Sequence, residues 1–447
     1  MKRSAVFWIA AFVSCFAAAT PKISLDSLVQ TGPNRVVVSY TLAESPALVT
    51  VSFETNFVNE AQETVWVPLA RGLAKTFVGD VNRVVQPGSR TFTWKARADW
   101  PDQKLAPGKI RANITARRLS NPPDYVVIDL EKESDAISYY ETAEDVPGGV
   151  TDDAYKTTKL LMRRIHAANV RWRMGASYDD SRWSAKSYPP AEAPHMVSLS
   201  EDYYIGVYEF TQKQYEIVAG YPLSTVPNAK PSETKSLVNA AKRPVTNVDY
   251  AALRGSYSWP SAGHDVSSTR CLGLLRTRYG FAFDLPTCAQ WEYAYRAGTT
   301  TSFFTGDMYN ASTSAAVLRD YAWTEGNTTG DDDGVDYSDK KKVHVVGRKL
   351  PNPWGLYDIA GNAVELCLDW AVLPDNAPSM GESVDPVGPA SRSATGSKES
   401  VRIWRGGSCV TGGMMGDDYD HRATAVYTWE GTYRCMGFRI CCPAVAK

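Results

Sequence analysis

The first part of the chain alternates hydrophobic and polar positions with a period of two. The segments RVVVSYTL, ALVTVSFET and RTFTWKA (residues 35–42, 47–55 and 90–96) carry β-branched or aromatic residues at every second position. Clusters of turn-forming residues, such as Gly32-Pro33-Asn34 and Pro87-Gly88-Ser89, separate the segments. Several short strands at this spacing predict an all-β sandwich of the immunoglobulin-like or fibronectin-like type over residues 20–130. Since this segment carries no catalytic constellation, we expect it to be a spacer or adhesion module.

The pattern changes after residue 130. Residues 131–157 are acidic and show no clear period, which favours a linker. In residues 158–447 helical signals are few, and the best are TQKQYEIVA after Phe210 and PTCAQWEYAYRAG after Leu285. In the second, Thr287 is a candidate N-cap and Gly298 a candidate terminator. A domain with so little regular structure needs other stabilising features, such as disulfides, buried tryptophans or bound ions.

The start of the chain has the features of an export signal. Lys2 and Arg3 precede an apolar stretch too short to span a bilayer, and small residues follow at Ala17–Ala19. We therefore predict a signal peptide over residues 1–19 and a secreted, periplasmic or cell-surface protein without a transmembrane segment. A lipid anchor on Cys15 is the alternative, although the residues before it match a lipobox poorly.

Composition narrows the classes of partner. The formal net charge is -1, with 44% hydrophobic and 22% charged residues, so no excess of charge favours nucleic acid or an anionic membrane. Seven cysteines remain outside the predicted signal peptide: Cys271, Cys288, Cys367, Cys409, Cys435, Cys441 and Cys442. In an oxidising compartment we expect disulfides, with at least one thiol left over. No CxxC pair occurs, which argues against a thiolate zinc site.

A set of motifs occurs in order along the second half. They are VRWRMG, HMVSLSEDYYIGVYEFTQKQY, RPVTNVDY, FDLPTCAQWEYAYRAGT, PNPWGLYDIAGNAVELCLDW, RIWRGGS and MGFRI, from Val170 to Ile440. In this order the set resembles the formylglycine-generating enzyme, or sulfatase-modifying factor, family over residues 160–445. The resemblance implies a C-type-lectin-like fold with low regular structure. The fold class expected for the whole chain is therefore α+β, with the all-β sandwich before that domain.

The resemblance also implies copper-dependent oxidation, but the residues at the family's copper-binding positions do not support it here. Oxidases of the family bind copper through two cysteines and convert a substrate cysteine to formylglycine. The matching positions here are Thr411 and Gly416, and neither is a soft ligand. Cys409 follows Ser408 directly, two positions too early, and a copper site would need a second cysteine nearby, Cys435 or Cys367. We favour a disulfide for Cys409, for example to Cys367, with Cys271 to Cys441 or Cys442 as a second bridge.

The family resemblance also implies structural calcium. The motif YDIAGNAVE would supply the side chains of Asp358 and Glu365 and the carbonyls of Gly361 and Ala363. The segment DDDGVDYSD resembles a second calcium site of the family more loosely, at Asp333 and Val335. In the alternative interpretation, Glu365 of the first motif caps a turn, and the acidic segment of the second motif is a solvated loop.

Iron-dependent relatives of the family carry histidine-rich sites, but the histidines here are scattered and show no ligand spacing. They are His166, His195, His264, His344 and His421.

These observations predict an exported protein whose second domain is a non-oxidase recognition module for a peptide, protein or glycan. Its groove should involve Trp404, Arg405, Ser408, Cys409, Trp429 and Tyr433. A formylglycine-generating-type oxidoreductase with rearranged thiols is the alternative, in which Cys409 and Ser408 would be the catalytic candidates. A lectin-like display domain is a third reading.

Overall fold

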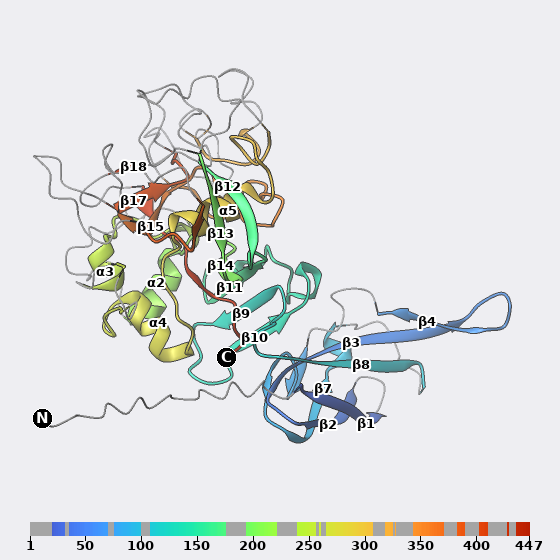
Figure 1. Ribbon diagram of the computed structural model, residues 1–447. Helices are drawn as coiled ribbons and strands as arrows, with labels where there is room; N and C mark the ends of the chain where they lie inside the picture. The colour runs from blue at the N-terminus through green and yellow to red at the C-terminus, as the bar shows by residue number, and fades with distance from the viewer. Residues whose placement is uncertain are drawn as a thin grey trace, which may run out of the picture. The chain divides into compact units, whose positions relative to one another are not determined.

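The structure is a computed structural model. It describes residues 20–31, 35–69, 76–99, 108–175, 194–220, 239–255, 259–260, 265–306, 318–324, 327, 343–370, 382–388, 402–409, 427–428 and 435–447. The chain divides into two compact units, and the boundary between them falls between Leu119 and Ser120. Each unit is described by itself below (Figure 1).

The first unit consists almost entirely of strands. They are β1 (Lys22–Gln30), β2 (Val36–Ala43), β3 (Ala47–Val58), β4 (Thr64–Pro68), β5 (Phe77–Gly79), β6 (Arg83–Val85), β7 (Gly88–Trp94) and β8 (Ile110–Arg117), with one short helix α1 (Ala96–Asp99). One sheet has the order β1-β2-β7-β5, and the other is built on β3, which pairs with β4, β6 and β8. All of these pairings are antiparallel.

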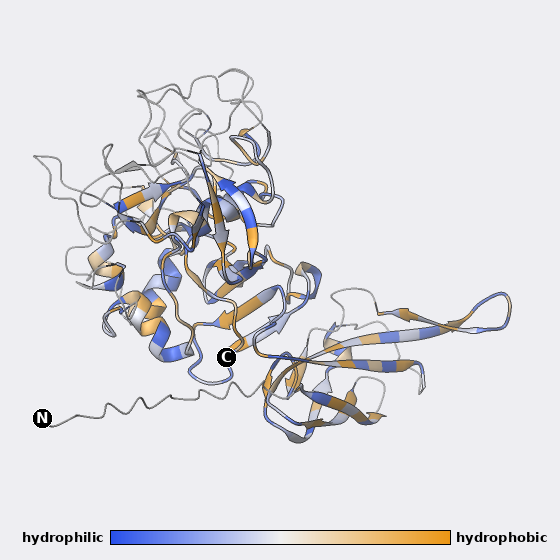
Figure 2. Ribbon diagram, viewed as in Figure 1, coloured by the Kyte–Doolittle hydropathy of each residue, from blue (hydrophilic) through white to orange (hydrophobic). Residues whose placement is uncertain are grey.

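Alternation along the strands builds the core of this unit. Along β2 every second side chain is buried, from Val36 to Leu42, as the period-two pattern predicts. Phe53 of one sheet stacks on Trp94 of the other, with ring centroids 4.8 Å apart. Hydrophobic and hydrophilic residues alternate along β3 and β8 in Figure 2. Apart from the short helix α1, the regular structure described in this unit therefore consists of β-strands, as the sequence predicts.

The second unit contains short strands in three sheets. The strands are β9 (Tyr125–Asp129), β10 (Ile137–Tyr140), β11 (Lys159–Ile165), β12 (Val170–Met174), β13 (His195–Leu199), β14 (Tyr203–Gly206), β15 (Val364–Trp370), β16 (Ser383–Val384), β17 (Arg402–Arg405), β18 (Tyr427–Thr428), β19 (Met436–Gly437) and β20 (Cys441–Pro443). The sheet orders are β10-β9-β11-β14-β20, β12-β13-β16 and β18-β17-β15-β19.

Helices are few and short in the described part of this unit. They are α2 (Gln212–Ala219), α3 (Tyr250–Arg254), α4 (Cys271–Tyr279) and α5 (Cys288–Arg296), with 3-10 turns at Ala143–Asp145, Asp153–Lys156 and Ala240–Lys242. The sequence predicted α2 and α5. The side chain of Thr287 caps α5 by accepting from the amide of Gln290, and α5 ends at Ala297 and Gly298, both with positive φ. α3 and α4 were not predicted; Arg270 at the start of α4 makes no side-chain cap.

Residues 120–157 belong to the second unit, so the second unit starts earlier than the predicted boundary at residue 158. The segment YVVIDL (residues 125–130) lies within the range predicted for the first domain, but it forms β9, which pairs with β10 and β11 in the five-stranded sheet. The expected linker is folded as well, because Tyr139, Val146 and Tyr155 are buried. The acidic residues of this segment favoured a linker in the sequence analysis, so the burial of these three side chains was not predicted. Within the described residues, no helix is long and apolar enough to cross a membrane.

Candidate functional site

The turn after β17 holds the Gly-Gly-Ser motif at the centre of the second unit. Gly406 and Gly407 have φ values of +95° and +70°, which side chains rarely adopt. A Cβ atom on Gly406 would lie 3.2 Å from the carbonyl oxygen of Ile359 and 3.2 Å from the ring of Trp291. The motif therefore requires glycine because the turn passes close to the core.

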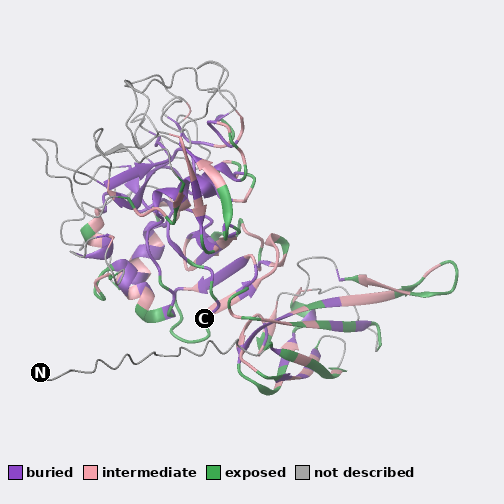
Figure 3. Cartoon of the chain, viewed as in Figure 1, coloured by how far each residue is buried: buried purple, intermediate pink, exposed green. Residues whose placement is uncertain are grey.

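The predicted groove residues that the structure describes are buried. Trp404, Arg405, Ser408 and Cys409 have exposed fractions of 2%, 1%, 1% and 0%, and β17 is coloured as buried in Figure 3. The guanidinium of Arg405 pairs with Glu292 of α5 at 3.3 Å. These four side chains pack the core and do not line an exposed groove. Trp429 and Tyr433 lie outside the described residues.

Cys409 lies beside Cys435. Their sulfur atoms are 3.9 Å apart, and both side chains are fully buried in a cluster with Trp323, Val343 and Ala363. Burial, followed by the neighbouring thiol, raises the pKa of Cys409 well above its usual value. A thiol in such surroundings is a poor nucleophile because the thiolate is the reactive form. Thr411 and Gly416, the family's thiol positions, lie outside the described residues.

The disulfides named from the sequence are absent from the structure. All seven described cysteines are buried and unbridged. Cys367, the suggested partner of Cys409, packs in a different cluster together with Cys288 and Cys441. The neighbour of Cys409 is therefore Cys435, because the chain before β19 returns to the start of β15.

Three buried carboxylates, of Glu209, Asp358 and Glu365, lie around the calcium motif. Burial raises the pKa of Asp358 to about 6, and it raises the pKa of Glu209 well above its usual value, with the charges of Asp358 and Glu365 adding to the effect. The guanidinium of Arg439 meets both oxygens of Glu365, with a shortest separation of 2.7 Å from Nη2 to Oε1. Arg439 also donates to the carbonyls of Gly206 and Tyr357, at 2.9 Å each.

Glu209 was missed by the sequence analysis. It follows β14 and has no exposed surface. Its carboxylate accepts from the backbone amide of Ala363 at 2.9 Å and from the side-chain amide of Asn362 at 2.6 Å. A single acidic residue after a hydrophobic strand gave no signal in the sequence, since burial of a charged residue depends on what packs over it.

The predicted calcium ligands agree only in part with this arrangement. Asp358 Oδ2 accepts from the amide of Gly347 at 2.6 Å, and the buried Oδ1 has no hydrogen-bond partner among the described residues. That oxygen suits a hard cation. Glu365, however, directs both oxygens at Arg439, and Oε2 also accepts from the indole of Trp291. Among the described residues, no group of three or more His, Cys, Asp or Glu side chains is arranged to hold a metal ion. Asp333 and Val335 lie outside the described residues.

A cleft of about 640 Å³ opens elsewhere in the second unit. Trp259, Leu285 and Val387 contribute apolar surface, and Glu201 and Asp385 contribute carboxylates. No ion pair within the described part of the chain neutralises these two carboxylates. The lining of the cleft therefore combines apolar walls, the carboxylates of Glu201 and Asp385, and an ion pair between Arg276 and Asp284. It does not include the predicted groove residues that the structure describes.

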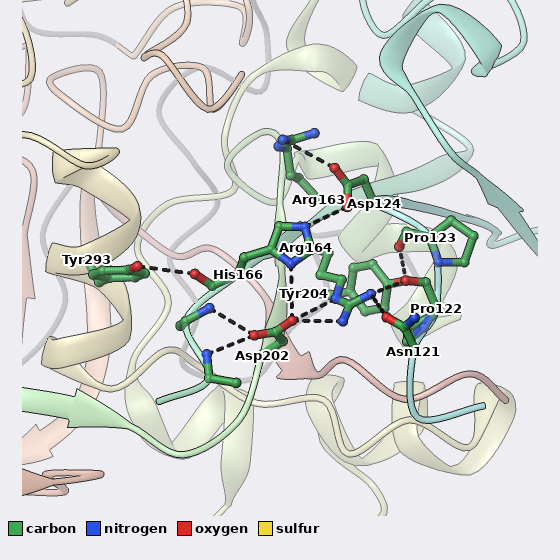
Figure 4. A network of polar contacts seen from close by, with 12 residues as sticks. Asn121, Pro122, Pro123, Asp124, Arg163, Arg164, His166, Asp202, Tyr204 and Tyr293 are labelled. Atoms are coloured by element: carbon green, nitrogen blue, oxygen red, sulfur yellow. Dashed lines mark hydrogen bonds and ion pairs between the residues drawn. The ribbon is translucent and has the colours of Figure 1, made fainter. Parts of the chain in front are cut away.

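A polar network joins the segment before β9 to β11 and β14 (Figure 4). The His166 ring lies 2.8 Å from Asp124 and 3.2 Å from Asp202. Arg164 pairs with Asp202 at 2.8 Å and donates to Asn121 at 2.9 Å. The hydrogen bond that the His166 ring donates to the carboxylate of Asp124 raises the pKa of His166. This network fixes residues 121–124 on the five-stranded sheet.

These features define a class of domain with short strands, few helices, glycine-dependent turns and buried ion pairs in place of long regular elements. The chain belongs to the family of the sulfatase-modifying factor enzyme 1-like domain, which matches residues 164–443.

Two curated relatives and one solved structure are similar to the chain. Chaperone protein LppX of Paenibacillus barcinonensis is 27% identical over 189 residues, which are 40% of this chain and 66% of that protein. A formylglycine-generating enzyme of Thermomonospora curvata is 31% identical over 157 residues, 35% of this chain and 48% of the enzyme. The chain thus spans less than two thirds of the length of either relative. The variable protein 1 of Treponema denticola is 26% identical with a TM-score of 0.42, covering 64% of this chain and 96% of that one.

Proposed function

We propose that the second unit is a non-oxidase recognition module of the formylglycine-generating family. The observation that carries this proposal is the burial of every described cysteine. An oxidase of the family must bring its sulfur atoms to a substrate cysteine, and thiols enclosed in the core are inert. The replacement of the family's two thiol positions by Thr411 and Gly416 supports the same conclusion.

A copper-dependent oxidoreductase with rearranged thiols is the second candidate. The 3.9 Å separation between the sulfur atoms of Cys409 and Cys435 favours it, since two thiolates suit Cu(I). The enclosing cluster of Trp323, Val343 and Ala363 does not fit a metal that must meet a substrate.

Copper loading separates the two candidates. Full-length protein should fail to hold Cu(I) against a competing chelator, and it should consume no oxygen with a Cys-x-Pro-x-Arg peptide. The Cys409→Ser variant is the matched control, and its copper retention should equal that of the wild type. Stoichiometric copper that disappears in this variant, together with conversion of the peptide cysteine to an aldehyde, would overturn the proposed function.

The cleft beside Trp259 is the proposed recognition surface. Apolar walls and the carboxylates of Glu201 and Asp385 favour a peptide or protein segment that presents apolar and basic side chains. Basic apolar peptides on an array should bind, and acidic analogues should not. Glu201→Lys should weaken binding at least about fivefold by charge reversal, whereas Glu131→Lys, outside the lining of the cleft, should not. Equal binding to acidic and basic peptides would exclude this cleft.

Export and the role of the first unit are part of the same proposal. We infer that residues 1–19 are removed on export and that the two packed sheets form a sandwich that acts as a spacer. N-terminal sequencing of the mature protein should begin near residue 20. A mature chain that begins at Met1 would contradict export by this route.

Calcium remains a proposal supported by the unpartnered Oδ1 of Asp358. Because Glu365 is bound to Arg439, the ion would rely on Asp358 and on oxygen atoms other than those of Glu365. Calcium should raise the melting temperature of the wild type relative to a chelator, and Asp358→Ala should abolish the difference. The control is Asp153→Ala, whose carboxylate pairs with Lys242 at the surface. A wild type insensitive to calcium would refute the proposal.

A further inference from the structure

We propose that Cys409 and Cys435 form a disulfide in the mature protein. The two thiols come from different segments, one after β17 and one before β19, and they enclose residues 410–434 of the chain. Their sulfur atoms are in contact at 3.9 Å. The bond would be a covalent modification site next to the Gly-Gly-Ser turn. It rests on the export that we propose above and not on the proposed recognition role.

The backbone holds both cysteines in position for this bond. The amide of Cys409 donates to the carbonyl of Asn362 at 3.0 Å, and the carbonyl of Cys435 accepts from the amide of Val364 at 2.9 Å. The two anchors are two residues apart on one segment, so the backbone at the start of β15 holds both cysteines. A disulfide requires the sulfur atoms to come closer by about 1.9 Å, to a bond length of about 2.05 Å. Side-chain rotation with a small backbone adjustment provides a movement of this size.

The surroundings favour the bridged form over two thiols. Cys409 and Cys435 have no exposed surface, and apolar side chains pack around them. A disulfide has no hydrogen to donate and is well suited to such a cluster. Cys367 does not compete for Cys409, because it packs in the other cluster beside Cys288.

The oxidation balances with a disulfide-bearing oxidant outside the cytoplasm, either a thiol–disulfide exchange protein or a small-molecule disulfide. The thiolate of one cysteine attacks a sulfur of the donor, and one donor thiol leaves. The second thiolate then attacks the mixed disulfide and releases the other donor thiol. The protein pair loses two electrons and two protons, and the donor disulfide becomes two thiols. Since burial suppresses the thiolate of folded Cys409, exchange takes place before the unit is fully packed.

Peptide mapping of the full-length exported protein tests the bond. Trypsin releases Cys409 on residues 406–422 and Cys435 on residues 435–439. After denaturation and alkylation without reductant, these two peptides should appear as one linked species that separates on reduction. Alkylated Cys409 and Cys435, or Cys409 linked to the peptide that carries Cys367, would overturn the inference. Free thiols without oxidase activity would overturn the bond alone and leave the proposed function standing.

Single substitutions provide the second measurement. Closing a loop of this length should raise the melting temperature by about 5 °C. Cys409→Ser and Cys435→Ser should each lose this gain, and the double variant should be no less stable than either. Cys271→Ser, also buried but in α4, is the control and should keep the linked peptides. If both single variants fold poorly, the peptide map of the wild type still shows whether Cys409 and Cys435 are linked. A native bond should also resist reductant until the protein unfolds.

Discussion

At the scale of single residues, the family motifs correspond to stabilising contacts in the core. Arg439 of the MGFRI motif pairs with Glu365 and donates to two backbone carbonyls from other segments. Gly361 has a φ of +81°, and a Cβ atom there would lie 2.4 Å from the carbonyl oxygen of Trp323. Residues of the family motifs therefore stabilise the core, and a chain can retain such motifs after losing an activity.

Arg439→Met should destabilise the second unit by about 3–5 kcal/mol, because it leaves the buried carboxylate of Glu365 without its partner. Denaturant unfolding measures this free energy. Arg171→Ala, which removes an exposed pair with Glu382 at 3.2 Å, should cost less than about 1 kcal/mol. Similar losses for both variants would show that the Arg439 network contributes little.

At the scale of elements, short strands are held together by side chains at their ends. β11 and β14 share four paired residues, from Met162 to Ile165 on β11. His166 and Asp202 adjoin this pairing and connect it to Asp124. The α5 capping box likewise fixes the start of a helix of only nine residues. Elements this short depend on such end contacts because few backbone hydrogen bonds stabilise them.

The His166 network should make stability depend on pH. The pKa of His166 is raised in the folded protein, first through Asp124. Its contribution to the stability of the folded protein is therefore fully present below the pKa of the unfolded state, and it is lost as the pH rises through the pKa of the folded state. Asp202 also favours the charged ring, whereas the charge of Arg164 opposes it. Relative to His166→Gln, the wild type should be more stable at about pH 5.5 than at pH 8. The gain should be at most about 2 °C because the ring is exposed. A pH-independent difference in melting temperature between the two proteins would contradict this assignment.

At the scale of the whole molecule, the second unit begins earlier than its family resemblance. The family match starts at residue 164, whereas the five-stranded sheet already includes β9 and β10. Tyr125, Val127 and Tyr155 pack with Tyr208 and Tyr357 in one cluster. The segment before the family domain is thus part of its core.

A fragment of residues 120–447 should fold, whereas residues 158–447 should not. The shorter fragment loses two strands of the five-stranded sheet and exposes the apolar surface beneath them. Circular dichroism and thermal unfolding of both fragments give the comparison. Equal melting temperatures would mean that residues 120–157 contribute nothing to the fold.

The sequence by itself determined the family, the all-β character of the first unit, and the helices α2 and α5 with the Thr287 cap. Each depends on local order: a motif, a period of two, or a capping residue beside a helical segment. Only the tertiary structure decided the contact between Cys409 and Cys435, the burial of the expected groove residues and of Glu209, and the pairing of β9 with β11. These features join segments far apart in the chain, and no local pattern specifies which distant surface covers a given side chain.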